Sequence, residues 1–123
     1  EEKEEKIEIS ESDNINLAIK ELAEYFEGKR REFTFKLSIK GTEFQKRVWK
    51  ELIKIPYGET RSYKEIAKAI GNENSSRAVG NANNKNKLAI VIPCHRVIGK
   101  DGGLGGYAYG INKKDYLLKL EKF

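Results

Sequence analysis

The chain has 123 residues, the size of one domain or of two very small ones. Its one cysteine cannot form an internal disulfide, and one cysteine with one histidine cannot supply the four ligands of a structural zinc site. No apolar run is long enough to cross a membrane, and we expect no signal peptide. These features exclude a disulfide scaffold, a membrane protein and a zinc module, and they favour the reducing cytoplasm.

Charge is spread unevenly along the chain. Lysine and arginine number 24 against 19 acidic residues, giving a net charge of +5. Residues 1–27 hold ten acidic residues and three lysines, so the excess of basic residues lies in residues 28–123. A basic body on a small domain attracts polyanions, most commonly nucleic acid. The alternative is a solvated Lys/Glu surface of the kind found in heat-stable proteins.

The first forty residues predict a helix followed by a strand. Apolar residues recur at spacings of three and four within residues 14–26, which predicts an amphipathic helix capped by Ser12 or Asp13 and ended by Gly28. Its expected buried face consists of Ile15, Ile19, Leu22, Ala23 and Phe26. Residues 33–39 alternate between apolar and polar, which predicts a strand.

Three helices are predicted next. Capping boxes mark the start of the first two, formed by Thr42 with Gln45 and by Ser62 with Glu65. Gly71 ends the second helix, and the third spans residues 76–83. Two short helices joined by a tight turn are typical of a helix-turn-helix, although the same pattern also occurs in ordinary helical corners.

The third helix has a face of small and polar residues. Ala78, Asn81, Ala82 and Lys85 share this face at spacings of three and four. Small side chains let a helix approach a neighbouring surface closely, and here that surface could be a narrow groove. The alternative is tight packing on the preceding helix, for which Val79 is the better candidate. We therefore expect the small face to be exposed.

The lone cysteine directly precedes the lone histidine. Residues 88–92 predict a short strand that ends at Pro93, before Cys94 and His95. An ordinary thiol has a pKa of about 8.5, so it needs a base such as histidine to become a nucleophile at neutral pH. Neighbours in a strand point to opposite faces, so this pair can couple only through a turn or a bridging water. The alternative is a buried, inert cysteine.

A glycine-rich loop over residues 99–110 and a final helix over residues 113–123 complete the chain. Tyr116, Leu117 and Leu120 are expected on the inner face of that helix, with Glu121 near its end. An acid at a helix C-terminus opposes the helix dipole, which suggests a specific partner for Glu121.

The segment Ile92-Pro93-Cys94-His95-Arg96-Val97-Ile98 resembles the active-site signature of the O6-alkylguanine-DNA alkyltransferases. Further blocks resemble the family in the same order along residues 16–121: Gly41 to Trp49, Ile55 to Gly58, Ser62-Tyr63, Arg77 to Ala82, Gly105 to Tyr107, and Leu117-Leu118 with Glu121. The resemblance implies an α+β fold. We expect a reduced N-terminal helix and strand region over residues 1–40. A mostly helical domain with a winged helix-turn-helix follows over residues 41–123.

The resemblance implies a suicide DNA repair protein. Its partner is double-stranded DNA containing O6-alkylguanine, which it flips out before moving the alkyl group irreversibly to Cys94. His95 acts through a water as base, oriented by Glu121. We expect a cytoplasmic monomer that uses no metal or other cofactor, binds no membrane and needs no obligate protein partner.

The resemblance also assigns roles around the cysteine. Asn86 stabilises the turn that shapes the pocket. Tyr63 crowds the phosphate beside the lesion and donates a proton to the departing guanine, while Arg77 fills the gap left by the flipped base. The helix that carries Ala78, Asn81 and Ala82 enters the minor groove, and Arg96 adds a further DNA contact. The base pocket is lined by Tyr107, Val97 and Ala108.

The chain departs from the family pattern in three ways. The region before residue 14 is much shorter than the ribonuclease-like domain usual in the family. Asn86-Lys87 stands where Asn-Pro is usual. Ala108 replaces a serine of some members and Asn83 a bulkier apolar residue. Two other functions remain: a protein that binds lesions without repairing them, against which the presence of Cys94 argues, and a cysteine hydrolase, for which a separate histidine is missing.

Overall fold

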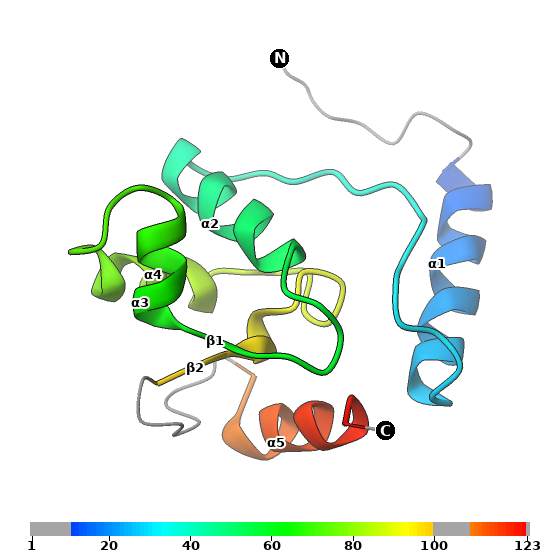
Figure 1. The fold of residues 1–123 in the computed structure, drawn as a ribbon. Coiled ribbons are helices and arrows are strands. Elements are labelled where there is room, and N and C mark those ends of the chain that lie inside the picture. Colours follow the sequence, from blue (N-terminus) through cyan, green and yellow to red (C-terminus); the bar gives the residue numbers. More distant parts are fainter. Residues whose placement is uncertain (1–10, 100–108, 123) are drawn as a thin grey trace. The chain divides into compact units, whose positions relative to one another are not determined.

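The computed structural model of the protein describes residues 11–99 and 109–122. Residue contacts gather into two compact units, Glu1–Lys40 and Gly41–Phe123. The described residues form five α-helices, one 3-10 turn and a two-stranded parallel sheet (Figure 1). The α+β class predicted from the sequence is confirmed.

The first unit contains helix α1 (Glu11–Phe26), which ends where expected because Gly28 adopts φ 77. The apolar face predicted for this helix is exposed: Ile15, Ile19 and Phe26 are 52%, 63% and 44% accessible. The buried residues are instead Asn14, Glu21 and Tyr25. The prediction of an inward apolar face is therefore wrong. The reason is that the buried side of α1 satisfies the backbone of the segment that follows it.

No strand forms at residues 33–39, contrary to the prediction. Side chains of α1 take the place of a partner strand: Glu21 accepts hydrogen bonds from the backbone N–H (2.7 Å) and the hydroxyl of Thr34. Asn14 likewise bonds both backbone groups of Lys36, at 3.0 and 3.1 Å. Alternation still holds in part, since Phe33 and Phe35 are half-buried and Thr34 and Lys36 are exposed. The alternation of apolar and polar residues determines which side of the segment is buried, but a β-ladder also needs a second strand to hydrogen-bond with.

The second unit is built from four helices and a minimal sheet. Its elements are α2 (Glu43–Ile53), β1 (Arg61–Ser62), α3 (Tyr63–Ala69), α4 (Ser76–Asn84), η1 (Cys94–Arg96), β2 (Val97–Ile98) and α5 (Ile111–Leu120). Strands β1 and β2 pair in parallel, with Arg61 opposite Val97 and Ser62 opposite Ile98. Helix α3 packs against α4, and α2 packs against both. The predicted pair of short helices is therefore present at α3 and α4.

Both predicted capping boxes are confirmed. The Thr42 hydroxyl and the Gln45 amide each accept the other's backbone N–H at 3.0 Å. Ser62 and Glu65 make the same reciprocal pair at 3.0 and 2.7 Å. Gly41 precedes the first box because a side chain there would lie 2.7 Å from the Trp49 ring. Each box satisfies two backbone donors that a helix start otherwise leaves open.

The core of the second unit is formed by α2, α3 and α4 together with residues 92–97 and α5. Its buried apolar side chains include Val48, Trp49, Leu52, Ile55, Ile66, Ala67, Ile70, Val79, Ile92, Val97 and Leu117. The Trp49 indole N–H donates to the carbonyl of Ala82 (2.9 Å), which ties α2 to α4. On the final helix Leu117 is buried as expected, whereas Tyr116 is 56% exposed rather than inward.

Residues 88–92 form turns, so the predicted strand is absent there. Asn86 closes this segment: its Nδ2 donates to the Ile92 carbonyl (2.8 Å) and its Oδ1 accepts from the Leu88 amide (2.9 Å). Ile90 adopts φ 76, a conformation that β-branched residues rarely take. Because Asn86 bonds the Leu88 amide and the Ile92 carbonyl, these backbone groups are not available to pair with a second strand. The glycine-rich segment predicted over residues 99–110 lies mostly outside the described residues.

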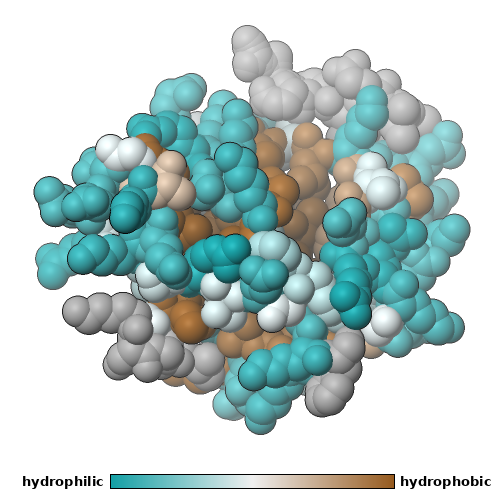
Figure 2. All heavy atoms as spheres, in the orientation of Figure 1, coloured by the Kyte–Doolittle hydropathy of each residue, from teal (hydrophilic) through white to brown (hydrophobic). Residues whose placement is uncertain are grey.

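Hydrophilic residues cover most of the face drawn in Figure 2, consistent with 35% charged residues. No helix in the described part of the chain has the length and apolar character that a bilayer crossing requires.

The contact of Glu21 with residues 34–35 yields a test of the first unit. Burial alone would raise the pKa of Glu21, but its hydrogen bonds from Thr34 and the charge of Arg30 bring that pKa below its ordinary value. Its stabilising effect is thus present above the ordinary glutamate range and is lost as the pH falls through the lowered pKa. We expect Glu21→Gln to cost about 1–3 kcal/mol of local stability at pH 7. The measurement is hydrogen exchange at the Thr34 and Phe35 amides.

Glu27→Gln is the matched control, because Glu27 is exposed and pairs at 3.5 Å with Lys29 on the surface. Unchanged exchange at Thr34 and Phe35 in the Glu21 variant would contradict the assigned contact.

Candidate active site

Cys94 and His95 lie together in one tight turn. The 3-10 turn η1 starts at Cys94, immediately after Pro93, and closes with the Arg96 amide donating to the Pro93 carbonyl (3.0 Å). Both side chains are buried, with 1% and 0% of their surface accessible. Cys94 and His95 therefore lie in a turn and not in a strand, and their diverging side chains can couple through a bridging water.

His95 is held by a buried carboxylate. Its Nε2 lies 2.7 Å from Oε2 of Glu121, the C-cap residue of α5. Burial lowers the pKa of His95, while the hydrogen bond and the charge of Glu121 partly oppose this effect. Among the described residues the Nδ1 atom has no hydrogen-bond partner. A neutral imidazole that donates from Nε2 has an acceptor at Nδ1, so His95 can receive a proton there.

Arg96 occupies the other side of the same carboxylate. Its Nε donates to Glu121 Oε1 and its Nη2 to Oε2, both at 2.8 Å, and its Nη1 donates to the Ile55 carbonyl at 2.8 Å. The side chain is 5% exposed and its guanidinium lies 5.7 Å from the centre of the Tyr57 ring. We expected Arg96 among the DNA contacts. The structure corrects this expectation, because the guanidinium is turned inward to neutralise Glu121.

Lys114 of α5 is a buried cation that the sequence analysis missed. It is 0% exposed, and its Nζ donates to the carbonyl of Val97 (2.6 Å). Burial lowers the pKa of Lys114 to about 8, and the nearby Cys94 acts in the opposite direction. Its spacing could have revealed it, since Lys114, Leu117 and Glu121 repeat at three and four residues on the buried side of α5.

Two asparagines hold the backbone around the cysteine. Asn86 spans the turn before it, and its own carbonyl accepts a hydrogen bond from the Tyr109 hydroxyl. Asn83 of α4 is 1% exposed, and its Nδ2 donates to the carbonyl of Cys94 (3.3 Å). Asn83 therefore connects α4 directly to the backbone of the candidate nucleophile.

Tyr63 and Arg77 lie on the helix pair. Tyr63 is the first residue of α3, half-buried, and its ring faces Gly80 of α4, where a side-chain carbon would lie 3.8 Å away. Burial raises the pKa of Tyr63, and the charge of Cys94 adds to the effect, so the phenol stays protonated near the thiol. Arg77 is exposed near the start of α4.

The small face of α4 is only partly exposed. Ala78 and Asn81 are exposed as expected, but Ala82 is 3% accessible, which corrects its assignment to a fully exposed face. The cause is α2, whose Trp49 bonds the Ala82 carbonyl. This face and the start of α2 still border a shallow hollow of about 240 Å³, whose wall includes Ala78, Asn81, Ala82, Lys85, Thr42 and Phe44.

Of the three residues expected in the base pocket, Tyr107 and Ala108 lie outside the described residues. Val97 is fully buried, directly after the turn, and its carbonyl is bonded by Lys114. Its amide donates back to the Cys94 carbonyl. The backbone of Val97 is thus fixed close to Cys94.

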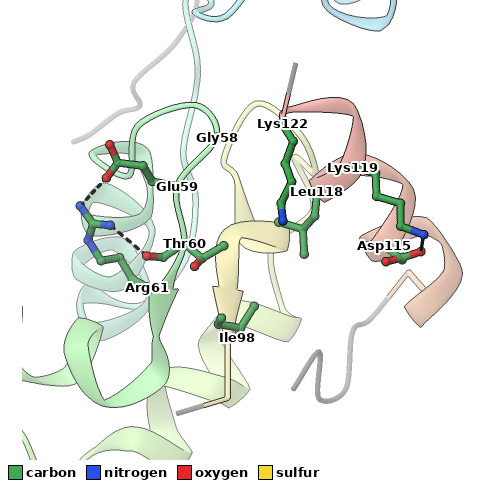
Figure 3. Close-up of a pocket in the computed structure, with 9 residues that line it drawn as sticks. All are labelled: Gly58, Glu59, Thr60, Arg61, Ile98, Asp115, Leu118, Lys119 and Lys122. Atoms are coloured by element: carbon green, nitrogen blue, oxygen red, sulfur yellow. Dashed lines mark hydrogen bonds and ion pairs between the residues drawn. The ribbon is translucent and has the colours of Figure 1, made fainter. Parts of the chain in front are cut away.

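A larger hollow of about 590 Å³ lies between the β1 region and α5 (Figure 3). Its wall includes Thr60, Arg61, Ile98, Asp115 and Leu118, and it does not include Cys94 or His95. Its charged side chains pair on the surface, Arg61 with Glu59 at 3.2 Å and Lys119 with Asp115 at 3.0 Å. The chemistry-bearing groups therefore gather at η1 rather than in this hollow.

The Glu121 cluster yields a stability test. Glu121→Gln leaves the buried Arg96 guanidinium without a countercharge, and losing one partner of a buried pair costs about 3–5 kcal/mol. We expect a loss of this size in the free energy of unfolding, measured by denaturant titration. Asp115→Asn is the matched control, because it breaks an exposed pair on the same helix and should change stability by less than about 1 kcal/mol. Equal effects of the two variants would contradict the assigned cluster.

Comparison with known proteins gives one consistent result. The profile of the 6-O-methylguanine DNA methyltransferase DNA-binding domain matches residues 43–123, and that of the ribonuclease-like domain matches residues 1–39. A methylated-DNA–protein-cysteine methyltransferase of Methanosarcina barkeri is 60% identical over 105 residues, 85% of this chain and 66% of the relative.

Solved structures agree. Mycobacterium tuberculosis OGT in complex with DNA is 56% identical with a TM-score of 0.86, over 87% of this chain and 66% of that one. An O6-methylguanine DNA methyltransferase from Methanococcus jannaschii is 34% identical with a TM-score of 0.68, over 99% and 73%. The chain spans about two thirds of the length of the relatives it matches. The chain belongs to the 6-O-methylguanine DNA methyltransferase family.

Proposed function

We propose that this protein repairs double-stranded DNA by moving the alkyl group of an O6-alkylguanine irreversibly to Cys94. The observation that carries the proposal is the buried turn in which Cys94 precedes a His95 whose Nε2 is held by Glu121 at 2.7 Å. A histidine that donates from Nε2 leaves Nδ1 to take the thiol proton. A reducing compartment such as the cytoplasm keeps the thiol available.

The chemistry needs a nucleophile and a proton donor. The Cys94 thiolate attacks the alkyl carbon in line, the carbon–sulfur bond forms, and the bond between that carbon and O6 breaks. The departing guanine then takes a proton, for which the protonated Tyr63 beside Cys94 is the candidate donor. The product is a thioether, and no second nucleophile beside the turn, among the described residues, would release it. Each molecule therefore reacts once.

DNA binding is assigned to the surface of α4. Arg77, Ala78 and Asn81 are exposed on this helix, and the basic character of residues 41–123 suits a phosphate backbone. Flipping a base costs a few kcal/mol, and an inserted side chain offsets part of that cost. Arg77 is the side chain that would fill the gap. Asn86 and Val97 hold the backbone beside Cys94. The family resemblance assigns Tyr107 and Ala108 to the base pocket.

The proposal is tested by mixing the protein with duplex DNA that contains radiolabelled O6-methylguanine. We expect one label per protein, on Cys94 and without turnover, because the thioether is stable. Cys94→Ala should lose transfer completely while it keeps DNA affinity, measured by gel shift. Label that stays on DNA bound by the wild type would indicate a protein that only binds lesions. Turnover of acyl esters without DNA would indicate a hydrolase.

Arg77 yields a second test. We expect Arg77→Ala to slow repair in duplex by at least about tenfold, because the flipped base then leaves an unfilled gap. Reaction with free O6-benzylguanine, which needs no flipping, should change by less than about twofold on the same reasoning. Lys50→Ala, an exposed change on α2, controls for the loss of one positive charge. Equal losses on both substrates would show that Arg77 does not act on the duplex.

A further inference from the structure

Asn83 is a buried polar side chain that belongs to the DNA-facing helix and reaches the nucleophile. It lies in the last turn of α4 and is 1% exposed. Its Nδ2 donates to the Cys94 carbonyl at 3.3 Å, across eleven residues of sequence. This bond fixes the orientation of the amide, because a flipped amide would set its oxygen against the carbonyl oxygen of Cys94.

The Oδ1 of Asn83 has no partner among the described residues, and the same is true of Nδ1 of His95. A buried polar atom without a hydrogen bond costs about 1–3 kcal/mol, so such atoms usually mark a place where a ligand or water is bound. Both side chains adjoin Cys94, one through its carbonyl and the other as the next residue. Two unsatisfied acceptors therefore belong to residues that adjoin Cys94.

Cys94 and His95 cannot face each other directly. Successive side chains in a 3-10 turn diverge by about 120°, so a proton moving from Sγ to Nδ1 needs a carrier. A buried water with two to four polar partners is the ordinary carrier. Here the thiol, His95 Nδ1 and Asn83 Oδ1 together supply three partners.

We propose that Asn83 is a positioning residue for the Cys94–His95 pair: its Nδ2 holds the cysteine backbone, and its Oδ1 accepts a hydrogen bond from the water through which His95 takes the thiol proton. This inference rests on the proposed function of Cys94. The water oxygen accepts the hydrogen of the thiol while its own two hydrogens donate to His95 Nδ1 and Asn83 Oδ1. When the thiol proton passes to the water, the water passes one of its hydrogens to Nδ1. The products are a thiolate, an imidazolium and the same water.

A water that is bound by both Asn83 and His95 is held in a more defined orientation than a water bound by His95 alone. A water that donates to a fixed acceptor on α4 presents its second hydrogen to Nδ1 and its lone pair to the thiol. Because Asn83 is part of α4, the geometry of the proton path is fixed by the same helix that is assigned to DNA. The charged and titratable groups near the pair come from several elements: Glu121, Lys114, Arg96, Tyr63 and Tyr109.

The test separates proton transfer from simple support of the backbone. The rate of benzyl transfer from free O6-benzylguanine to Cys94 is measured in the full chain at pH 7.0 and pH 9.5. Asn83→Leu, of similar size, should react about tenfold more slowly at pH 7.0, where a base is needed. At pH 9.5 hydroxide can take the thiol proton in place of His95, so the variant should come within about twofold of the wild type. Lys114 loses its charge over this range in both proteins, so it cancels in the comparison.

Asn84→Leu is the matched control, because Asn84 is exposed on the same helix. Asn83→Ala repeats the test if leucine does not fit the site. A double-mutant cycle with His95→Gln adds a second readout: residues that share one water should be non-additive, so the double variant should be no slower than His95→Gln. An equal loss at both pH values, no loss at pH 7.0, or additive losses would each overturn the proposal.

Repeating these rate measurements with iodoacetamide separates a failure of this inference from a failure of the proposed function. If the wild type leaves O6-benzylguanine intact, the proposed function fails. The pH-dependent difference between wild type and Asn83→Leu toward iodoacetamide then still decides whether Asn83 assists removal of the thiol proton.

Discussion

The structure of the candidate active site depends on one buried carboxylate. Glu121 receives two hydrogen bonds from Arg96 and a contact from His95, all at 2.7–2.8 Å and out of solvent. A buried carboxylate needs a countercharge, and Arg96 supplies it with a planar fork that uses both oxygens. Because Arg96 carries the charge balance, His95 can remain neutral. The end of α5, the turn η1 and the loop at Ile55 are thereby joined at one point.

This charge arrangement explains why the cysteine can be buried and still be suited to reaction. A thiolate formed in an apolar interior would be costly, but polar groups lie near Cys94: Lys114 and Tyr63 interact with its charge, and Asn83 bonds its carbonyl. Lys114 also holds Val97, the residue whose amide closes the turn on the Cys94 carbonyl. The same groups that shape the turn therefore also set its electrostatic environment.

The sequence predicted features that depend on local pattern. Both capping boxes and the helix pair follow from residues close to one another along the chain. Prediction from the sequence failed where the structure depends on a partner that is distant along the chain. The alternating segment after Gly28 forms no strand because Glu21 and Asn14 bond its backbone. Arg96 was predicted to contact DNA because its partner Glu121 lies 25 residues away along the chain. Asn83 was noted only as a departure from the family pattern, and its bond to the Cys94 carbonyl was not predicted, because a backbone partner leaves no pattern in the sequence.

We infer that Glu121 fixes His95 as a neutral base with its proton on Nε2. His95 is the only histidine in the sequence, so its ring nitrogens can be observed by ¹⁵N NMR without ambiguity. We expect the Nε2–H tautomer at pH 7 and a pKa of His95 below the usual histidine value, because burial disfavours the charged ring. A ring that is protonated on both nitrogens at pH 7, or that carries its proton on Nδ1, would contradict this role of Glu121.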